Sequence, residues 1–349
     1  MSIEIPILDA LELLVVVDNE TDTLSSVEPG VPQIPEIASL MDRLPPSRHH
    51  DDHPATSVFD HLCVACHGFS VLVTGRRGDH TRRFLFDVGP YGEVWLDNAE
   101  RLGIDLATIE GLFLSHWHAD HSGGFPTVVA AIAAARAASG LAAPIVDLHP
   151  DRPDQRGLQL PTGAFALLPP EPTFGEIEAA GGEIERHAEA HTVADLFVGS
   201  GAIDRVTAYE TGLVGHHSFV GDEVTPDPLI LDERFFAAHV RGRGISVLSA
   251  CSHAGVVNAC LGAMGMAPGM PVDVVLGGYH LAGRAMEARI ADTVRDLADL
   301  VSPRVLAPGH CTGWRAKAAL GDVFSPGRYG PSVVGSRYRL EAEEIALAD

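Results

Sequence analysis

Short apolar runs bounded by glycine and polar residues recur along the chain from Phe69 onward. Runs of this kind predict buried strands, and longer stretches with helical apolar spacing predict helices. Strands are expected at residues 70–74, 83–88, 109–115, 144–148, 245–250, 272–276 and 304–307, and helices at 98–103, 125–139, 256–264, 285–300 and near 314–320. A turn is expected at 75–79. Two strand-rich halves with helices outside each predict an α/β fold, an αββα sandwich.

Two regions depart from this alternation. Residues 19 to about 56 are polar and rich in proline, which predicts a loop or an insertion. Residues 150–215 are irregular, with turns at Pro169–Pro170 and Gly181–Gly182, and are expected to form hairpins and loops over one face. The whole chain, residues 1–349, is therefore interpreted as one domain that carries both regions.

Charge narrows the classes of partner. The 349 residues include 24 Lys and Arg against 47 Asp and Glu, a formal charge of −23. A chain this acidic disfavours nucleic acid and anionic membranes as partners, so a small-molecule substrate is expected. The N-terminus has acids where a signal peptide carries basic residues, and five scattered cysteines form no disulfide framework; both features favour the cytoplasm. The sequence leaves the oligomeric state open.

The strongest chemical signal follows the predicted strand at 109–115. His116, His118, Asp120 and His121 lie within six residues, directly before Gly123 and Gly124. Imidazole nitrogen and carboxylate oxygen suit zinc and similar divalent ions, and a catalytic zinc needs about three protein ligands plus water. Four ligands on one loop can therefore serve two neighbouring ions.

Three further histidines follow predicted strands. His253 comes after the apolar run at 245–250, His280 after 272–276 and His310 after 304–307. Strand ends meet at one edge of a sheet, so these side chains are expected near the ligand loop.

With these motifs the chain resembles the metallo-β-lactamase fold superfamily. The later segments around His253, His280 and His310 resemble its dihydropteroate-synthase-like branch, that of 7,8-dihydropterin-6-methyl-4-(β-D-ribofuranosyl)aminobenzene-5′-phosphate synthase. The resemblance covers roughly residues 69–313. It implies an αββα metallo-β-lactamase sandwich with a metal site at the strand ends.

The resemblance also implies roles for individual residues. His116, His118 and His253 would bind one ion, and Asp120, His121 and His310 the second, with His280 as a ligand, a proton carrier or a substrate contact. Asp87 would accept a hydrogen bond that orients a ligand histidine or the loop. Many members carry a bridging aspartate before the position of His253, but this chain has none; Cys251 or His253 is available for that role, and a single tightly held ion is the other reading.

The expected chemistry is hydrolysis. Zinc lowers the pKa of bound water from about 16 to about 7, so metal-bound hydroxide would attack a small anionic or phosphorylated substrate, with Asp120 as ligand and proton acceptor. The expected cofactor is Zn²⁺, as two ions or one, with Mn²⁺ or Fe²⁺ as other options. Arg284, close to His280 in sequence, would suit a phosphate. Asp232, Glu233 and His216 are weighed as substrate contacts, although ordinary surface or loop positions are favoured.

Two alternatives stay open. The first is the synthase activity that the branch implies, which joins the pterin and the ribofuranosylaminobenzene phosphate. The second is a non-hydrolytic metal or haem redox protein, because Cys63, Cys66 and His67 match the C-x-x-C-H pattern of haem attachment. Unbonded thiols are the favoured interpretation of that motif, with His67 able to approach the metal site.

Overall fold

Two large mixed sheets pack face to face in the computed structural model, which describes residues 3–50 and 53–343. The first sheet runs β13 (His191–Val193), β14 (Phe197–Gly199), β17 (Phe236–Val240), β18 (Gly244–Ser249), β19 (Val272–Gly278) and β20 (Val305–Gly309), with β1 (Ile7–Leu8) beside β17. The second runs β12 (Glu183–Arg186), β9 (Ile145–Leu148), β8 (Gly111–Phe113), β7 (His80–Phe86), β6 (Ser70–Arg77), β2 (Ala10–Val17), β21 (Arg337–Glu341) and β3 (Gln33–Ile34).

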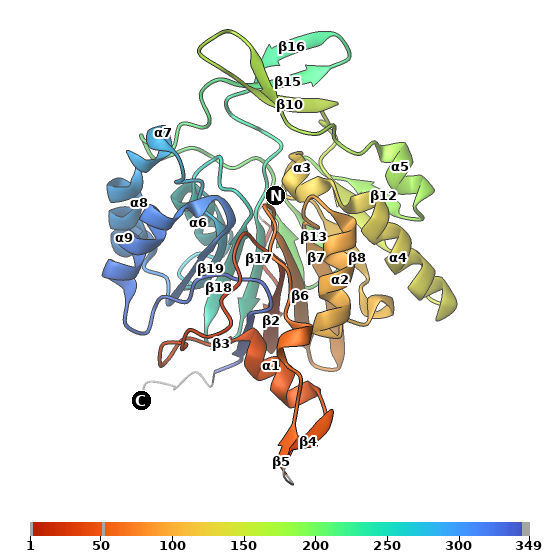
Figure 1. The fold of residues 1–349 in the computed structure, drawn as a ribbon. Helices are drawn as coiled ribbons and strands as arrows, with labels where there is room; N and C mark the ends of the chain where they lie inside the picture. The colour runs from red at the N-terminus through yellow and green to blue at the C-terminus, as the bar shows by residue number, and fades with distance from the viewer. Residues whose placement is uncertain (1–2, 51–52, 344–349) are drawn as a thin grey trace.

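Helices cover the outer face of each sheet (Figure 1). The first sheet carries α6 (Val256–Met266), α7 (Arg284–Glu287), α8 (Ile290–Asp296) and α9 (Trp314–Phe324), and the second carries α2 (Gly92–Leu102), α4 (Phe125–Ala138) and α5 (Phe174–Ala179). The layers are thus helix, sheet, sheet, helix, which confirms the predicted αββα sandwich. None of the helices in the described part of the chain is long and apolar enough to cross a membrane.

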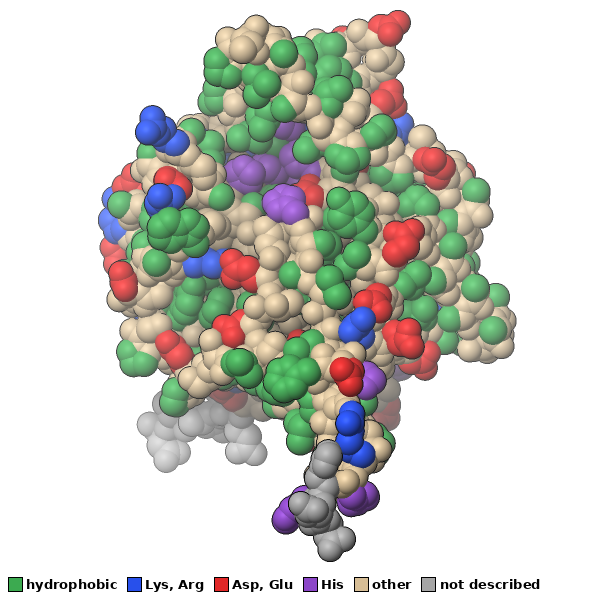
Figure 2. All heavy atoms as spheres, viewed as in Figure 1, with side chains coloured by type: hydrophobic (Ala, Val, Ile, Leu, Met, Phe, Trp, Pro, Cys, Tyr) green, Lys and Arg blue, Asp and Glu red, His purple; other side chains and the backbone are tan. Residues whose placement is uncertain are grey.

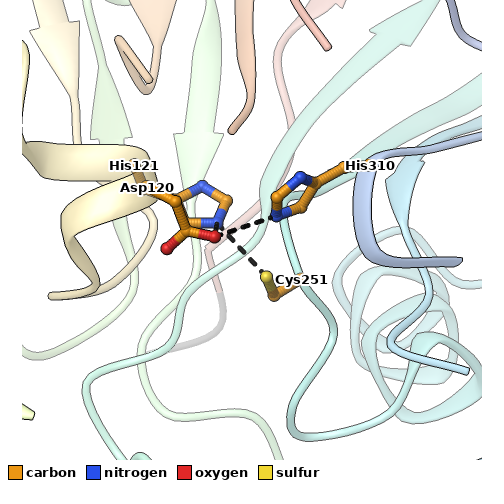
Figure 3. A group of neighbouring side chains, drawn as sticks. All are labelled: Asp120, His121, Cys251 and His310. Carbon is orange, nitrogen blue, oxygen red and sulfur yellow. Dashed lines mark hydrogen bonds and ion pairs between the residues drawn. The ribbon is translucent and has the colours of Figure 1, made fainter. Parts of the chain in front are cut away.

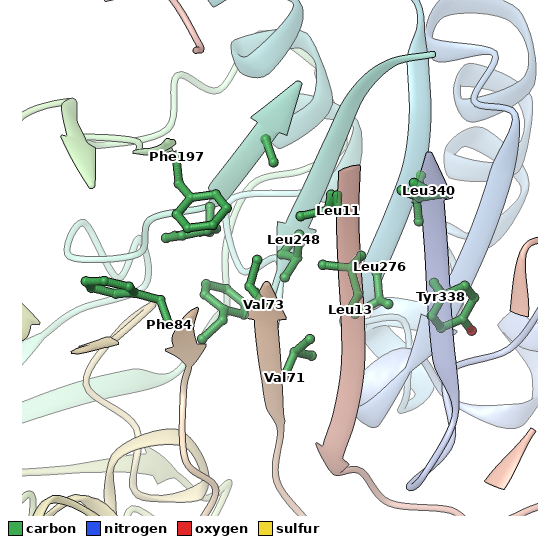
Figure 4. Packing of buried hydrophobic residues seen from close by; sticks show 14 of the residues in the cluster. Leu11, Leu13, Val71, Val73, Phe84, Phe197, Leu248, Leu276, Tyr338 and Leu340 are labelled. Carbon is green, nitrogen blue, oxygen red and sulfur yellow. The ribbon is translucent and has the colours of Figure 1, made fainter. Parts of the chain in front are cut away.

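The main core lies between the two sheets (Figure 4). Leu13 and Val73 of one sheet meet Leu248 and Leu276 of the other, and all four are fully buried. Each such side chain contributes about 1.5–3 kcal/mol by leaving water. Separate apolar layers join each sheet to its own helices.

The predicted turn at 75–79 is wrong in extent, because β6 continues to Arg77 and the turn holds only Gly78 and Asp79. Gly75 lies inside the strand for a packing reason: a Cβ there would lie 2.6 Å from the ring of Phe197 on the facing sheet. The glycine permits close approach of the sheets rather than a reversal of the chain.

Region 150–215 forms hairpins, as predicted, but its strands also join larger sheets. It supplies β12 to one large sheet and β13 and β14 to the other. Its remaining strands join a separate four-stranded sheet, which stands above the sandwich in Figure 1 and is made of β11 (Phe165–Leu167), β10 (Gln155–Gln159), β15 (His216–Val220) and β16 (Glu223–Pro226). These strands are short and show little alternation of apolar and polar residues, so their pairing could not be predicted from the sequence.

The proline-rich segment holds β3, α1 (Glu36–Arg43) and a hairpin of β4 (Arg48–His50) and β5 (His53–Ala55), which projects at the opposite end of the molecule (Figure 1). Residues 51–52 of this segment lie outside the described residues. Because β3 pairs with β21, part of the segment belongs to the second large sheet.

Candidate metal centre

Strands of both large sheets deliver the candidate ligands to one edge, below the small sheet. Asp87 follows β7, the loop of His116 to His121 follows β8, and His253, His280 and His310 follow β18, β19 and β20. Asp87, His280 and His310 have positive φ angles of 57°, 43° and 43°. Residues other than glycine rarely adopt this conformation, which turns the side chain sharply at the strand end and occurs often at functional sites.

His116, His118 and His253 form a compact group, the three-histidine group. Nδ1 of His118 lies 2.9 Å from Nε2 of His116 and 3.1 Å from Nε2 of His253. All three side chains are buried, and burial holds their pKa values well below the usual histidine value. The imidazoles are therefore neutral, and each has a lone pair to offer to a cation.

Asp120, His121, Cys251 and His310 form a second group, the mixed group (Figure 3). Cys251 Sγ lies 3.2 Å from His121 Nε2, and Asp120 Oδ2 lies 3.3 Å from His310 Nε2. Although burial opposes a charge on His121, Asp120 and Asp87 raise its pKa to about 9. Burial likewise raises the pKa of Asp120, but the neighbouring His121, His310 and His67 side chains hold it well below its usual value. This group is charged where the first is neutral.

Hydrogen bonds orient the histidines of the mixed group. One carboxylate oxygen of Asp87 accepts from the backbone N–H of Ser115 at 2.7 Å, and the other accepts from His121 Nδ1 at 2.8 Å. His310 donates its backbone N–H to Asp18 at 2.8 Å, and its Nδ1 donates to Asn19 Oδ1 at 2.9 Å. These contacts leave the Nε2 atoms of both histidines directed at the group, the arrangement in which histidine binds a metal.

Three further residues support the three-histidine group: Asp232 and Glu233 before β17, and His216 from β15 of the small sheet. Glu233 accepts the backbone N–H groups of His253 and Ala254 at 2.7 and 2.6 Å, and Asp232 accepts that of Trp117 at 2.7 Å. His216 Nδ1 donates to the Asp227 carbonyl oxygen at 2.7 Å, so its Nε2 accepts from His118 Nε2 at 2.9 Å.

The expected surface positions of Asp232, Glu233 and His216 were wrong, because these residues are 3%, 2% and 2% exposed. Asp232 and Glu233 do lie in a loop, the one between β16 and β17, whereas His216 begins β15. One hint was present in the sequence, the adjacent carboxylates of Asp232 and Glu233. Their role as acceptors for the ligand loops could not be predicted, because the backbone N–H groups that they bind are distant in sequence.

The donors fit a divalent cation. Tetrahedral zinc with bonds of about 2.0–2.1 Å places ligand atoms about 3.3 Å apart, close to the spacings in both groups. His310 Nε2 is buried and makes no hydrogen bond in the described structure. Nitrogen, oxygen and sulfur donors together suit zinc better than manganese, which prefers oxygen.

His67 and His280 both lie at the site. His67 Nε2 lies 3.4 Å from Asp120 Oδ2, with 68% of its side chain exposed. The ring of His280 lies 4.3 Å from that of His253. Burial lowers the pKa of His280, but Cys311 opposes this and the net shift is upward.

Arg284 and the cysteines of the C-x-x-C-H segment lie apart from the two groups. Arg284 is exposed at the start of α7 and is absent from the described lining of the cavity above the metal groups. Cys63 is 7% exposed and packs in the apolar layer between the second sheet and its helices, so it is not available for a thioether bond to haem.

A cavity of about 540 Å³ opens above both groups. Figure 2 shows histidines at its floor and apolar side chains of the small sheet over it. The polar floor and rim comprise Asn19, Glu20, His67, His118, Asp120, His216, His253, His280, His310 and Cys311. The apolar wall includes Leu158, Leu167, Leu168, Leu213 and Trp314. No Lys or Arg occurs among the described lining residues, so bound metal would be the main partner for an anion.

Comparisons with known proteins agree with this geometry. The family model of the metallo-beta-lactamase superfamily matches residues 64–279. A curated protein of Methanocaldococcus jannaschii, 7,8-dihydropterin-6-methyl-4-(beta-D-ribofuranosyl)-aminobenzene-5'-phosphate synthase, is 26% identical over 261 residues, which cover 74% of this chain and 85% of that protein. The crystal structure of Tm1679, described as a metal-dependent hydrolase of the beta-lactamase superfamily, aligns with a TM-score of 0.65 at 21% identity, covering 96% of this chain and all of that one.

The model match spans more than half of the chain and includes every member of the three-histidine group and of the mixed group except His310. The ligand loop after β8 lies within the matched region, as do the strands from β6 to β19. The chain belongs to the metallo-beta-lactamase superfamily.

Proposed function

We propose that this chain is a zinc-dependent enzyme of hydrolytic type that acts on a small molecule. The observation that carries the proposal is the pair of ligand groups at the floor of one cavity, three neutral imidazoles beside a charged Asp, His, Cys, His set. The three-histidine group would hold one ion, and the mixed group would hold the second, with Cys251 in place of the missing aspartate. Bound zinc supplies Lewis-acid polarisation of the scissile bond and activation of water.

The protein's own residues then position the reactants. Asp120 lines the cavity, so its carboxylate is within reach of a water or a substrate proton. His280 lines the same wall beside His253 and is placed to carry a proton to a leaving group. His67, on the exposed side of Asp120, closes the rim.

The cavity also constrains the substrate. Leucines of the small sheet and Trp314 favour a molecule with an apolar or flat body, and the metal-facing floor favours an electrophilic or anionic head group. Since the described lining has no basic side chain and Arg284 lies outside it, a phosphate would depend on the metal ions for recognition. The proposed class is therefore a small anionic ester, lactone or phosphoester whose charge meets the metal centre.

Synthase activity is the second candidate. The M. jannaschii relative carries a synthase name and matches most of this chain. In that reaction the metal-facing floor would bind the diphosphate that leaves the pterin, instead of activating water for hydrolysis. The apolar wall would hold the flat pterin ring.

A direct comparison of the two activities tests the proposal. Zinc-loaded protein is incubated with chromogenic carboxylic esters, lactones and phosphodiesters, and separately with a dihydropterin diphosphate plus a ribofuranosylaminobenzene phosphate. We expect turnover in the first panel that is lost in Asp120→Asn and on chelation. Joined pterin product without hydrolysis would favour the synthase, and no zinc-dependent turnover in either panel would refute both candidates.

A further inference from the structure

Two cysteines meet at the edge of the metal centre, although they come from different strand ends. Cys251 follows β18, and Cys311 lies in the short turn that follows β20. Their Sγ atoms are 3.5 Å apart. The other cysteines lie elsewhere: Cys63 and Cys66 at the helical face of the second sheet, and Cys260 within α6.

The two sulfurs have different surroundings. Cys311 lines the cavity and is partly exposed, so a small solute can reach it. Cys251 is 3% exposed, and its Sγ lies 3.2 Å from His121 Nε2 within the mixed group. The pair therefore links the open cavity to the candidate ligands of the second ion.

The backbone leaves room for both sulfurs. A Cβ on Gly278, at the end of β19, would lie 2.6 Å from Cys311 Sγ and 2.5 Å from the Ala250 carbonyl oxygen. This glycine thus keeps open the space that Cys311 occupies. A disulfide has an S–S length of about 2.05 Å, so bond formation needs the two Sγ atoms to approach by roughly 1.5 Å.

We propose that Cys251 and Cys311 are a peroxide-sensitive thiol pair that controls metal binding in the mixed group. Cys311 sulfur attacks one oxygen of hydrogen peroxide, the O–O bond breaks, and a sulfenic acid and water form. Cys251 sulfur then attacks Cys311 sulfur, the S–O bond breaks, and the hydroxide that leaves takes the Cys251 thiol proton to form a second water. The two sulfurs lose two electrons in total and the peroxide gains them.

Disulfide formation removes the Cys251 sulfur as a thiolate donor. The mixed group then retains Asp120, His121 and His310, while the three-histidine group is unchanged. Oxidation therefore weakens binding of the second ion selectively, and a thiol reductant restores it. This metal consequence rests on the proposed function, whereas formation of the disulfide does not.

Peptide mapping tests the disulfide directly. The intact chain, zinc-loaded or chelator-treated, is exposed to hydrogen peroxide, alkylated without reduction, digested and analysed by mass spectrometry. We expect linked peptides that contain Cys251 and Cys311, with loss of two hydrogens, in both samples and faster in the chelated one. The link should disappear in Cys311→Ser and on treatment with dithiothreitol, and persist in the matched control Cys260→Ala.

Metal content gives the second readout on the same samples. Zinc in the wild-type chain should fall by about one ion on oxidation and return after reduction and zinc addition, whereas peroxide should release none from Cys311→Ser. Linked peptides in a chain that binds no zinc before treatment would refute the proposed function and the metal consequence but leave the thiol pair intact. Absence of the linked peptides in chelated wild-type protein, with both thiols free or singly oxidised, would overturn the pair itself. Circular dichroism of each variant checks that it is folded.

Discussion

The three-histidine group and the mixed group lie side by side, yet they are built in opposite ways. In the first, burial keeps every imidazole neutral, and carboxylates act only on backbone N–H groups of the ligand loops. In the second, carboxylates contact the ligands directly, and His121 carries a raised pKa. A cation can enter the first group without displacing a proton, but in the second it must compete with one.

This contrast teaches how one loop can serve two ions. His118 and Asp120 are two residues apart, but His118 turns toward His253 and His216, whereas Asp120 turns toward His67 and His310. The two groups are thus expected to differ in affinity, pH response and sensitivity to supporting residues.

The largest expected effect follows loss of a ligand from the neutral group. His118→Ala should lower zinc-dependent turnover by about 10³-fold or more, since several kcal/mol of transition-state stabilisation depend on the ion. The measurement is kcat/KM for any substrate that the panel reveals. His217→Ala, on β15 beside His216, is the matched control and should stay within about twofold. Turnover retained in His118→Ala would show that the reaction does not depend on an ion in the three-histidine group.

The next effect concerns pH. Below a pKa of about 9, His121 binds a proton that zinc must displace, and burial raises the pKa of the Cys251 thiol, whose proton is also lost on binding. Affinity at the mixed group should therefore fall at least about tenfold per pH unit, or at least about 100-fold from pH 8 to 6. The three-histidine group should change little over this range, because its pKa values lie well below 6.5. Competitive chelator titrations of His253→Ala and His310→Ala isolate the mixed and the three-histidine group respectively. Equal pH slopes in the two variants would contradict the difference in charge.

Support from Asp87 should matter to one group only. Asp87→Asn keeps a side chain of the same shape but removes the negative charge that faces His121. We expect zinc affinity of the mixed group to fall about 10- to 100-fold, the usual cost of losing such a partner, with the three-histidine group unaffected. Equal weakening of both groups would show that Asp87 supports the fold of the loop instead.

The smallest effect is expected at Arg284. Because this side chain is exposed and lies outside the described cavity lining, Arg284→Ala should change KM and kcat by less than about twofold. A much larger increase in KM, seen only with phosphorylated substrates, would show that Arg284 contacts the substrate phosphate.

The sequence predicted the ligands better than their supports, and the reason is distance along the chain. His116, His118, Asp120 and His121 share one loop, and His253, His280 and His310 each follow a strand with a clear apolar pattern. Asp18, Asn19 and His216 act on ligands about 100 to 290 residues away, through contacts that local periodicity does not encode.

The same limit applies to the fold. Long apolar strands such as β18 and β19 were predictable, because buried parallel strands are continuous hydrophobic runs. The small sheet over the cavity was not, since its strands are partly exposed at many positions and pair across long loops.

Metal content measured by elemental analysis tests the central claim most directly. The wild-type chain, purified without added metal and then equilibrated with zinc, is compared with His253→Ala and His310→Ala. We expect about two zinc ions per wild-type chain and about one in each variant, with the ion retained in His310→Ala showing the flatter pH response. A wild-type chain that binds no zinc, or one ion that neither substitution removes, would contradict the two-group account.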